Sequence, residues 1–247
     1  FIVNTDDIYE SQKKMILELQ NRSVDGLMIV LALESFETIQ PTIADLEMLD
    51  IPYVLIDRSI PDFRCNKVVF DNEYGGYIAT KALIEAGHRH IGCIGLNADS
   101  QNISGIQRYQ GYLKALDESN IGVNNDYVAP GDFHFEGGYK AADVLLRHKE
   151  LTAVFAINDL TAFGFMRRSE ELGIHCPQDI SIVGYDNLDL AQMMGLPLTS
   201  VRQSTALLAQ ESVRNLMKQL EEKDFLQEIT LEPQLIYKST VERIKLA

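Results

Sequence analysis

Short, continuous runs of Val and Ile, separated by amphipathic stretches, constrain the fold of this chain more than any other feature. Each run is four to seven residues long and is apolar throughout rather than alternating. Parallel strands that are buried on both faces have this pattern. The predicted strands are 1–4, 26–32, 52–57, 67–71, 91–95, 153–157 and 180–185.

The stretches between these runs carry apolar residues at helical spacing. Pro41 is expected in the first turn of a helix that runs to about residue 50, and Ser104 is expected to cap a helix that runs to residue 120. The other predicted helices are 6–21, 73–86, 136–149, 159–172 and 204–223. Strands that alternate with helices predict an α/β fold with parallel sheets and helices on both sides, as one wide sheet or two smaller ones.

Charge and composition exclude several functions. Across 247 residues, 22 Lys and Arg face 36 Asp and Glu, which gives a net charge of −14. Such an acidic chain repels phosphates, so we do not expect it to bind nucleic acid by itself. No apolar run is long enough to span a membrane. Cys65, Cys93 and Cys176 are odd in number and far apart, which favours a reducing compartment over a disulfide framework.

Recognisable catalytic and cofactor motifs are absent. The sequence has no dinucleotide or phosphate-binding glycine motif, no nucleophile elbow and no zinc-binding motif. His88 and His90 could form half of a metal site, but nothing supplies a third ligand, so we interpret them as turn residues before a strand. We therefore predict no catalytic residue, no metal and no cofactor.

Ligands of parallel α/β folds bind beyond the carboxyl ends of the strands. Polar residues in those positions are therefore the first candidates for a binding site. They are Asp57 and Arg58, Asp71 and Asn72, residues 97–104, Asn158 and Asp159, and Asp186 and Asn187.

Several of these segments resemble the lactose-repressor/galactose-repressor family of bacterial transcription regulators. The segment GIHCPQDISIVGYD at 173–186 is very similar to the family pattern G..vP.DisvvGfD, and PYVLIDR at 52–58 resembles PvVliDR. Further matches in family order are VDGLMI at 24–29, VFDNEYGG at 69–76, GHRHIG at 87–92, RYQGY at 108–112 with Ala115 and Leu116, AVFAIND at 153–159 with Ala162 and Gly164, and PLTSVRQ at 197–203.

The resemblance implies a type I periplasmic-binding-protein-like fold of two α/β subdomains hinged around a ligand cleft. The N-terminal subdomain is expected to comprise 1–71 plus 203–232, and the C-terminal subdomain 72–202 plus 233–247. Two departures from the family pattern stand out. The helix-turn-helix and hinge helix that bind operator DNA have no counterpart here. Residues 1–7 resemble the family's second strand, so the resemblance implies that its first strand and helix are missing.

The resemblance also assigns candidate ligand-binding residues. The fork of Arg108 can bind two adjacent hydroxyls or a carboxylate, and Asp186 can accept from two hydroxyls. Each candidate has a structural alternative, as a surface arginine, a helix cap, a core aromatic or a hinge residue. The full set is Arg108, Asp186, Asn158, Phe133 (an aromatic position that stacks on ligand), Ser104, Gln203 and Asp57.

These residues suit a neutral sugar best, while a purine, an acidic sugar and a sugar phosphate remain open. We expect the effector-binding and dimerisation domain of a cytoplasmic repressor, which contacts operator DNA only through the absent N-terminal domain. The implied partners are a small-molecule effector, with a sugar favoured, and a second copy of the chain in a homodimer. No membrane partner is expected. The alternatives are a periplasmic sugar-binding protein of a transporter, an enzyme, and a domain that responds to a protein co-repressor.

Overall fold

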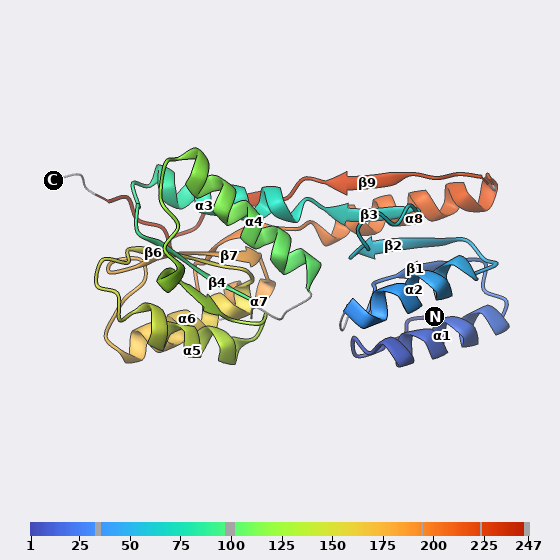
Figure 1. The fold of residues 1–247 in the computed structure, drawn as a ribbon, viewed down its shortest axis with the longest axis horizontal. Helices are drawn as coiled ribbons and strands as arrows, with labels where there is room; N and C mark the ends of the chain where they lie inside the picture. Colours follow the sequence, from blue (N-terminus) through green and yellow to red (C-terminus); the bar gives the residue numbers. More distant parts are fainter. Residues whose placement is uncertain (33–35, 97–101, 194, 223, 245–247) are drawn as a thin grey trace. The chain divides into compact units, whose positions relative to one another are not determined.

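Two compact α/β units make up the chain in the computed structural model (Figure 1). The structure describes residues 1–32, 36–96, 102–193, 195–222 and 224–244. Unit 1 comprises Phe1–Phe70, Gln101–Ile103 and Ser204–Leu231. Unit 2 comprises Asp71–Ser100, Ser104–Gln203 and Glu232–Ala247.

Unit 1 contains a four-stranded parallel sheet in the order β1-β2-β3-β9. Its core combines strand residues such as Leu27, Ile29 and Leu55 with Ile16 and Leu46 from the helices. The described elements are α1 (Tyr9–Asn21), β1 (Leu27–Ile29), α2 (Phe36–Glu47), β2 (Tyr53–Asp57), β3 (Lys67–Phe70), α8 (Thr205–Glu221) and β9 (Glu228–Leu231).

Unit 2 contains a six-stranded sheet in the order β10-β8-β7-β6-β4-β5, in which β10 alone pairs antiparallel. Its strands are β4 (Ile91–Gly95), β5 (Val128–Pro130), β6 (Ala153–Ala156), β7 (Ser181–Asp186), β8 (Thr199–Arg202) and β10 (Gln234–Ile236). Its helices are α3 (Asn72–Glu85), α4 (Ile103–Glu118), α5 (Phe135–Leu145), α6 (Asp159–Glu171), α7 (Asp189–Met193) and a 3-10 turn at Asn125–Tyr127.

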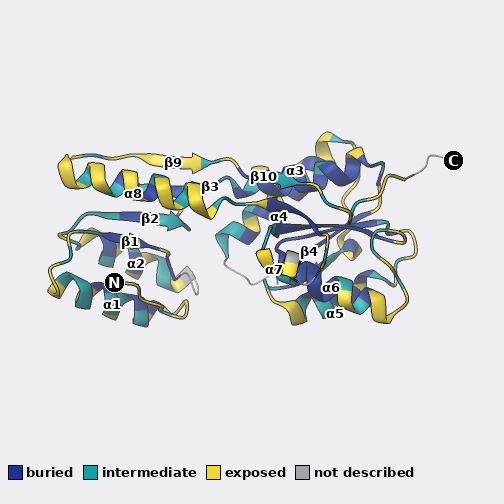
Figure 2. Cartoon of the chain, turned by 180° about the vertical axis from the view of Figure 1, so that it is seen from behind, coloured by how far each residue is buried: buried dark blue, intermediate teal, exposed yellow. Residues whose placement is uncertain are grey.

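Helices cover both faces of this larger sheet, so its central strands are buried (Figure 2). Val154 and Ala156 of β6 pack on the side of α5 and α6, whereas Ala153 and Phe155 pack on the side of α3 and α4. Successive side chains of a strand point to opposite faces, and here both faces meet apolar neighbours. This double burial explains why the strands are apolar throughout.

The α/β fold class predicted from the sequence is confirmed, but three local predictions are wrong. Residues 1–4 form no strand, and the side chains of Phe1 and Ile2 are exposed, because no neighbouring strand pairs with this segment. Pro41 lies inside α2, which already begins at Phe36 and packs Ile39 and Ile43 against the core of unit 1. A proline at this depth removes one helical hydrogen bond and crowds the carbonyl four residues earlier, so packing against the core must offset this cost.

The third wrong prediction concerns Ser104, which is the second residue of α4 rather than its cap. Strands β5, β8, β9 and β10 were not predicted, because their sequences VAP, TSVR, EITL and QLI contain no continuous apolar run of four residues. Among the described residues, no helix is both long and apolar enough to cross a bilayer.

His88 is buried at the start of β4 and ties the carboxyl-terminal segment to the sheet, which agrees with its interpretation as a structural residue. Its Nδ1 lies 2.9 Å from Thr152 Oγ1, and its Nε2 lies 3.1 Å from the carbonyl oxygen of Glu242. The second contact needs a proton on Nε2, which makes this nitrogen the donor. Burial lowers the pKa of His88 below its ordinary value of 6.5.

This lowered pKa predicts an acid-dependent loss of stability. The unfolded imidazole takes up a proton near pH 6.5 and the folded one only at lower pH, so acidification through this window favours the unfolded state. Between pH 7.5 and 5.5, we expect the free energy of unfolding of the wild type, taken relative to that of His88→Gln, to fall by up to about 1.4 kcal/mol per pH unit. Urea unfolding at both pH values measures this difference. Parallel pH dependence in the two proteins would contradict it.

Candidate functional site

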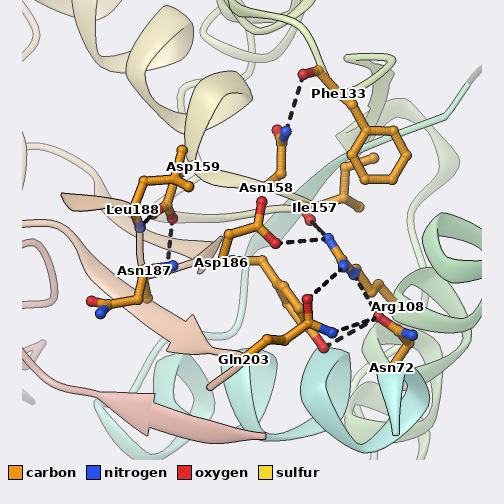
Figure 3. Close-up of polar contacts among 12 residues, drawn as sticks. Asn72, Arg108, Phe133, Ile157, Asn158, Asp159, Asp186, Asn187, Leu188 and Gln203 are labelled. Carbon is orange, nitrogen blue, oxygen red and sulfur yellow. Dashed lines mark hydrogen bonds and ion pairs between the residues drawn. The ribbon is translucent and has the colours of Figure 1, made fainter. Parts of the chain in front are cut away.

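The guanidinium of Arg108 is the centre of a polar cluster at the carboxyl end of the larger sheet (Figure 3). Arg108 lies in the second turn of α4 and is 5% exposed. Its Nε donates to Asn72 Oδ1 at 2.9 Å, and its Nη1 donates to the carbonyl oxygen of Ile157 at 2.8 Å. A buried guanidinium is tolerated only where acceptors replace water, and these two bonds supply the strongest replacements.

Two further acceptors approach Arg108 at longer distance. Nη1 lies 3.4 Å from Asp186 Oδ1, and Nη2 lies 3.4 Å from Gln203 Oε1. Gln203 Nε2 in turn lies 3.4 Å from Asn72 Oδ1. Contacts of this length are weak hydrogen bonds, because optimal N–H···O distances are close to 2.9 Å. We call the side of the guanidinium that faces Asn72 and the Ile157 carbonyl its inner edge, and the side that faces Asp186 and Gln203 its outer edge. The outer edge is held more loosely than the inner edge.

Two aromatic rings complete the surroundings of Arg108. The Tyr185 ring centroid lies 3.7 Å from Arg108 Cζ, and the Phe133 centroid lies 5.6 Å from it. Burial raises the pKa of Tyr185 to about 12, so its hydroxyl stays neutral and can donate to Asn72 Oδ1, 3.4 Å away. Both rings stabilise the cation by cation–π interaction.

Close packing of α3 against α4 fixes the position of the Arg108 backbone, from which its side chain extends. A Cβ at Gly76 of α3 would lie 2.0 Å from the carbonyl oxygen of Arg108, and a Cβ at Gly111 of α4 would lie 2.0 Å from that of Glu73. The two helices can approach this closely only because both contact points lack a side chain. The position of the Arg108 backbone thus depends on two glycines.

The structure brings five of the seven predicted site residues into this cluster. Asn158 caps α6 by accepting from Thr161 N at 2.9 Å, and its Nδ2 donates to the carbonyl oxygen of Phe133 at 3.0 Å. Asn158 therefore does cap a helix, which was the structural alternative to its role in ligand binding. The cluster members are Arg108, Asp186, Asn158, Phe133 and Gln203.

The other two predicted residues lie apart from these contacts. Ser104 is half-buried one helical turn before Arg108, on the same side of α4. Asp57 ends β2 in unit 1, with a left-handed φ of 66°. Residues 97–101, named above among the polar segments, lie outside the described part of the chain.

Sequence reasoning missed Asn72 and Tyr185 as members of the cluster. Asn72 was flagged only as a polar residue after a strand, although its amide oxygen accepts from Arg108. Tyr185 looked like ordinary strand core, and no sequence signal marks its contact with a cation. Both contacts depend on the packing of separate elements, α3 and β7 against α4.

Chemically, the cluster is suited to binding. It combines a bidentate donor, a carboxylate acceptor and an apolar ring, the groups that bind hydroxyl-bearing ligands. The described residues contain no group of three or more His, Cys, Asp and Glu side chains that could hold a metal ion.

Comparison with known proteins agrees with this reading. A family profile of the periplasmic binding protein-like domain matches residues 80–241. The HTH-type transcriptional repressor PurR of Vibrio vulnificus is 33% identical over 98% of this chain and 72% of its own length. A complex of the transcriptional regulator CelR with cellobiose is 30% identical with a TM-score of 0.80, over 94% of this chain and 70% of that one.

A LacI family transcriptional regulator from Enterococcus faecium, solved with bound ribose, is also similar. It is 29% identical with a TM-score of 0.81, over 99% of this chain and 88% of its own. All three relatives are described as transcriptional regulators, which favours regulation over the transporter and enzyme alternatives.

The close approach of Gly76 to the Arg108 backbone predicts how a single methyl group added at this glycine changes stability. Gly76→Ala should push α4 away from α3 and lower the free energy of unfolding by about 3 kcal/mol or more, because the new Cβ meets rigid backbone. Gly122→Ala is the control, since a Cβ there meets nothing within 4 Å, and its effect should stay within about 0.5 kcal/mol. Chemical unfolding of both variants checks this. Equal stability of the two would contradict the close-packing argument.

Proposed function

Because the chain belongs to the lactose-repressor/galactose-repressor family of transcriptional regulators, we propose that the Arg108 cluster binds the small effector that controls operator binding. Operator DNA is contacted by a separate DNA-binding domain, in keeping with the net charge of −14 on this chain. The observation that carries the proposal is a buried guanidinium that is held firmly by Asn72 and the Ile157 carbonyl, whereas its contacts with Asp186 and Gln203 both measure 3.4 Å.

A ligand hydroxyl can improve on those contacts. Two adjacent hydroxyls offer the Arg108 fork acceptors at optimal distance, while their protons are donated to Asp186. Asp186 is suited to this role because its side chain is 28% exposed, in contrast to the 7% exposure of the Arg108 side chain. The ring of Phe133 supplies an apolar surface for the C–H groups of the ligand.

We propose a neutral sugar as the effector. The relatives solved with ligand carry cellobiose or ribose. An acidic sugar or a sugar phosphate needs a second cation, and the nearby candidate Arg202 is exposed and donates to Gln234 Oε1 at 2.6 Å. Arg58 of unit 1 is paired with Asp7. A purine would favour more than one stacking ring. Of the two rings that lie beside Arg108 in the described part of the chain, Tyr185 is fully buried, which leaves Phe133 to stack on a ligand.

Thermal unfolding against ribose, cellobiose, acidic sugars, sugar phosphates and purines tests this function. A ligand at about 100 times its Kd stabilises the fold by about 2.7 kcal/mol, which corresponds to a Tm increase of about 5–10 °C. We expect a neutral sugar to give this increase, and Arg108→Lys and Asp186→Asn to abolish it.

Arg202→Lys is the matched control, because this exposed arginine lies outside the contacts of Arg108. It should bind a neutral sugar as the wild type does. Loss of binding in Arg202→Lys would favour an anionic ligand instead. A Tm increase that survives both Arg108→Lys and Asp186→Asn would place the effector elsewhere.

We also infer that the chain forms a homodimer, since regulators of this kind read two operator half-sites. Sedimentation velocity at micromolar concentration should give twice the mass of one chain. A single species of one-chain mass would contradict the inference.

A further inference from the structure

The loop after β7 has a backbone that L-amino acids adopt rarely. Asp186 has a φ of 99° and Asn187 a φ of 52°, and neither is a glycine. Conformations of this kind cost free energy and persist only where the surrounding structure imposes them. The Asp186 carboxylate that faces Arg108 therefore depends on whatever holds this loop.

Asp159, the first residue of α6, holds the loop from outside the ligand cluster. Its Oδ2 accepts from Leu188 N at 2.7 Å, and its Oδ1 accepts from Ser200 Oγ at 2.6 Å. Ser200 Oγ, on β8, accepts from Asn187 N at 3.0 Å. One carboxylate thus fixes two successive backbone N–H groups that follow Asp186, as the left side of Figure 3 shows.

Space for this carboxylate is created by a glycine. A Cβ at Gly184 of β7 would lie 2.4 Å from Asp159 Oδ1 and 2.9 Å from Leu198 Cδ2. Asp159 itself is completely buried. Burial raises its pKa to about 6, although its hydrogen bonds to Ser200 and Leu188 act in the opposite direction. A carboxylate in such a position is costly.

A role as a helix cap does not account for this cost. The α6 terminus already has a cap, because Asn158 Oδ1 accepts from Thr161 N. Both Asp159 oxygens instead accept from groups of other elements, the loop after β7 and strand β8. The contacts of Asp159 are therefore directed at the loop that carries Asp186.

We propose that Asp159, together with Ser200, is a positioning residue of the effector site: it imposes the left-handed backbone at Asp186 and Asn187 and so directs the Asp186 carboxylate at Arg108 and the ligand. Among the described residues, no hydrogen bond or ion pair joins Asp159 to Arg108, so Asp159 would act through Asp186. The ligand part of this inference rests on the function proposed above, whereas the loop part does not.

The test combines a ligand-free and a ligand-binding measurement on the full chain. Asp159→Asn keeps the side-chain shape but cannot accept at both positions, and Ser200→Ala removes the hydroxyl that holds Asn187. In crystal structures of either variant, we expect Asp186 to leave its left-handed conformation and its carboxylate to move away from Arg108. In calorimetric titration with ribose and with cellobiose, we expect affinity to fall about tenfold for whichever sugar the wild type binds.

Thr240→Val is the matched control. Thr240 is a buried residue beside the same sheet, whose hydroxyl donates to the Ile182 carbonyl oxygen at 2.7 Å and accepts from Thr199 N at 2.9 Å. Among the described residues, its hydroxyl forms no hydrogen bond with the loop that carries Asp186, so its loss should reduce stability and leave sugar affinity unchanged.

A double-mutant cycle separates positioning from general destabilisation. If Asp159 acts through Asp186, then Asp159→Asn should weaken binding much less in an Asp186→Asn background than in the wild type. Equal weakening in both backgrounds would overturn the proposal, as would an unchanged Asp186 conformation in the Asp159→Asn crystal. If Asp159→Asn does not fold, Ser200→Ala carries the same test. If the wild type binds neither sugar, the proposed sugar effector fails, and the ligand-free structures alone decide the positioning role.

Discussion

Burial of one positive charge organises the larger unit of this protein. A guanidinium that is taken out of water must find an acceptor for each of its edges, and the chain supplies these from separate elements. Asn72 begins α3, Ile157 and Asp186 lie at the ends of β6 and β7, and Gln203 follows β8. The carboxyl ends of three neighbouring strands and the amino end of one helix are therefore arranged around Arg108.

The acceptors are unequal, and the proposed function depends on this inequality. Asn72 and the Ile157 carbonyl hold Arg108 at short distance and fix its direction. Asp186 and Gln203 approach only to 3.4 Å, so a ligand that offers better geometry can replace or tighten these contacts. The two short bonds hold the guanidinium in place before a ligand binds, and the two long contacts leave its outer edge able to bind that ligand.

The sequence was informative wherever a single segment determines the outcome. Continuous burial of β6 on both faces is visible as an apolar run, and the resemblance to the regulator family placed Arg108 and Asp186 correctly at strand ends and helix starts. Prediction failed where the outcome depends on distant partners. Residues 1–4 are apolar enough for a strand but pair with no neighbour.

The role of Tyr185 shows the same limit inside the site. Its ring looks like core until α4 places a guanidinium 3.7 Å away, and that approach depends on glycines in two helices. The left-handed backbone at Asp186 is equally invisible in the sequence, since it is imposed by Asp159 from another element. Local periodicity carries no information on such contacts.

The most direct test of the central claim follows Arg108 itself. The nuclear magnetic resonance signal of the Arg108 Nε–H group, assigned with Arg108→Lys, can be observed while ribose or cellobiose is added. If Arg108 binds the effector, this signal shifts and saturates at the same sugar concentration that raises the Tm. A sugar that stabilises the protein while the Arg108 signal stays unchanged would contradict the assignment of this cluster as the effector site.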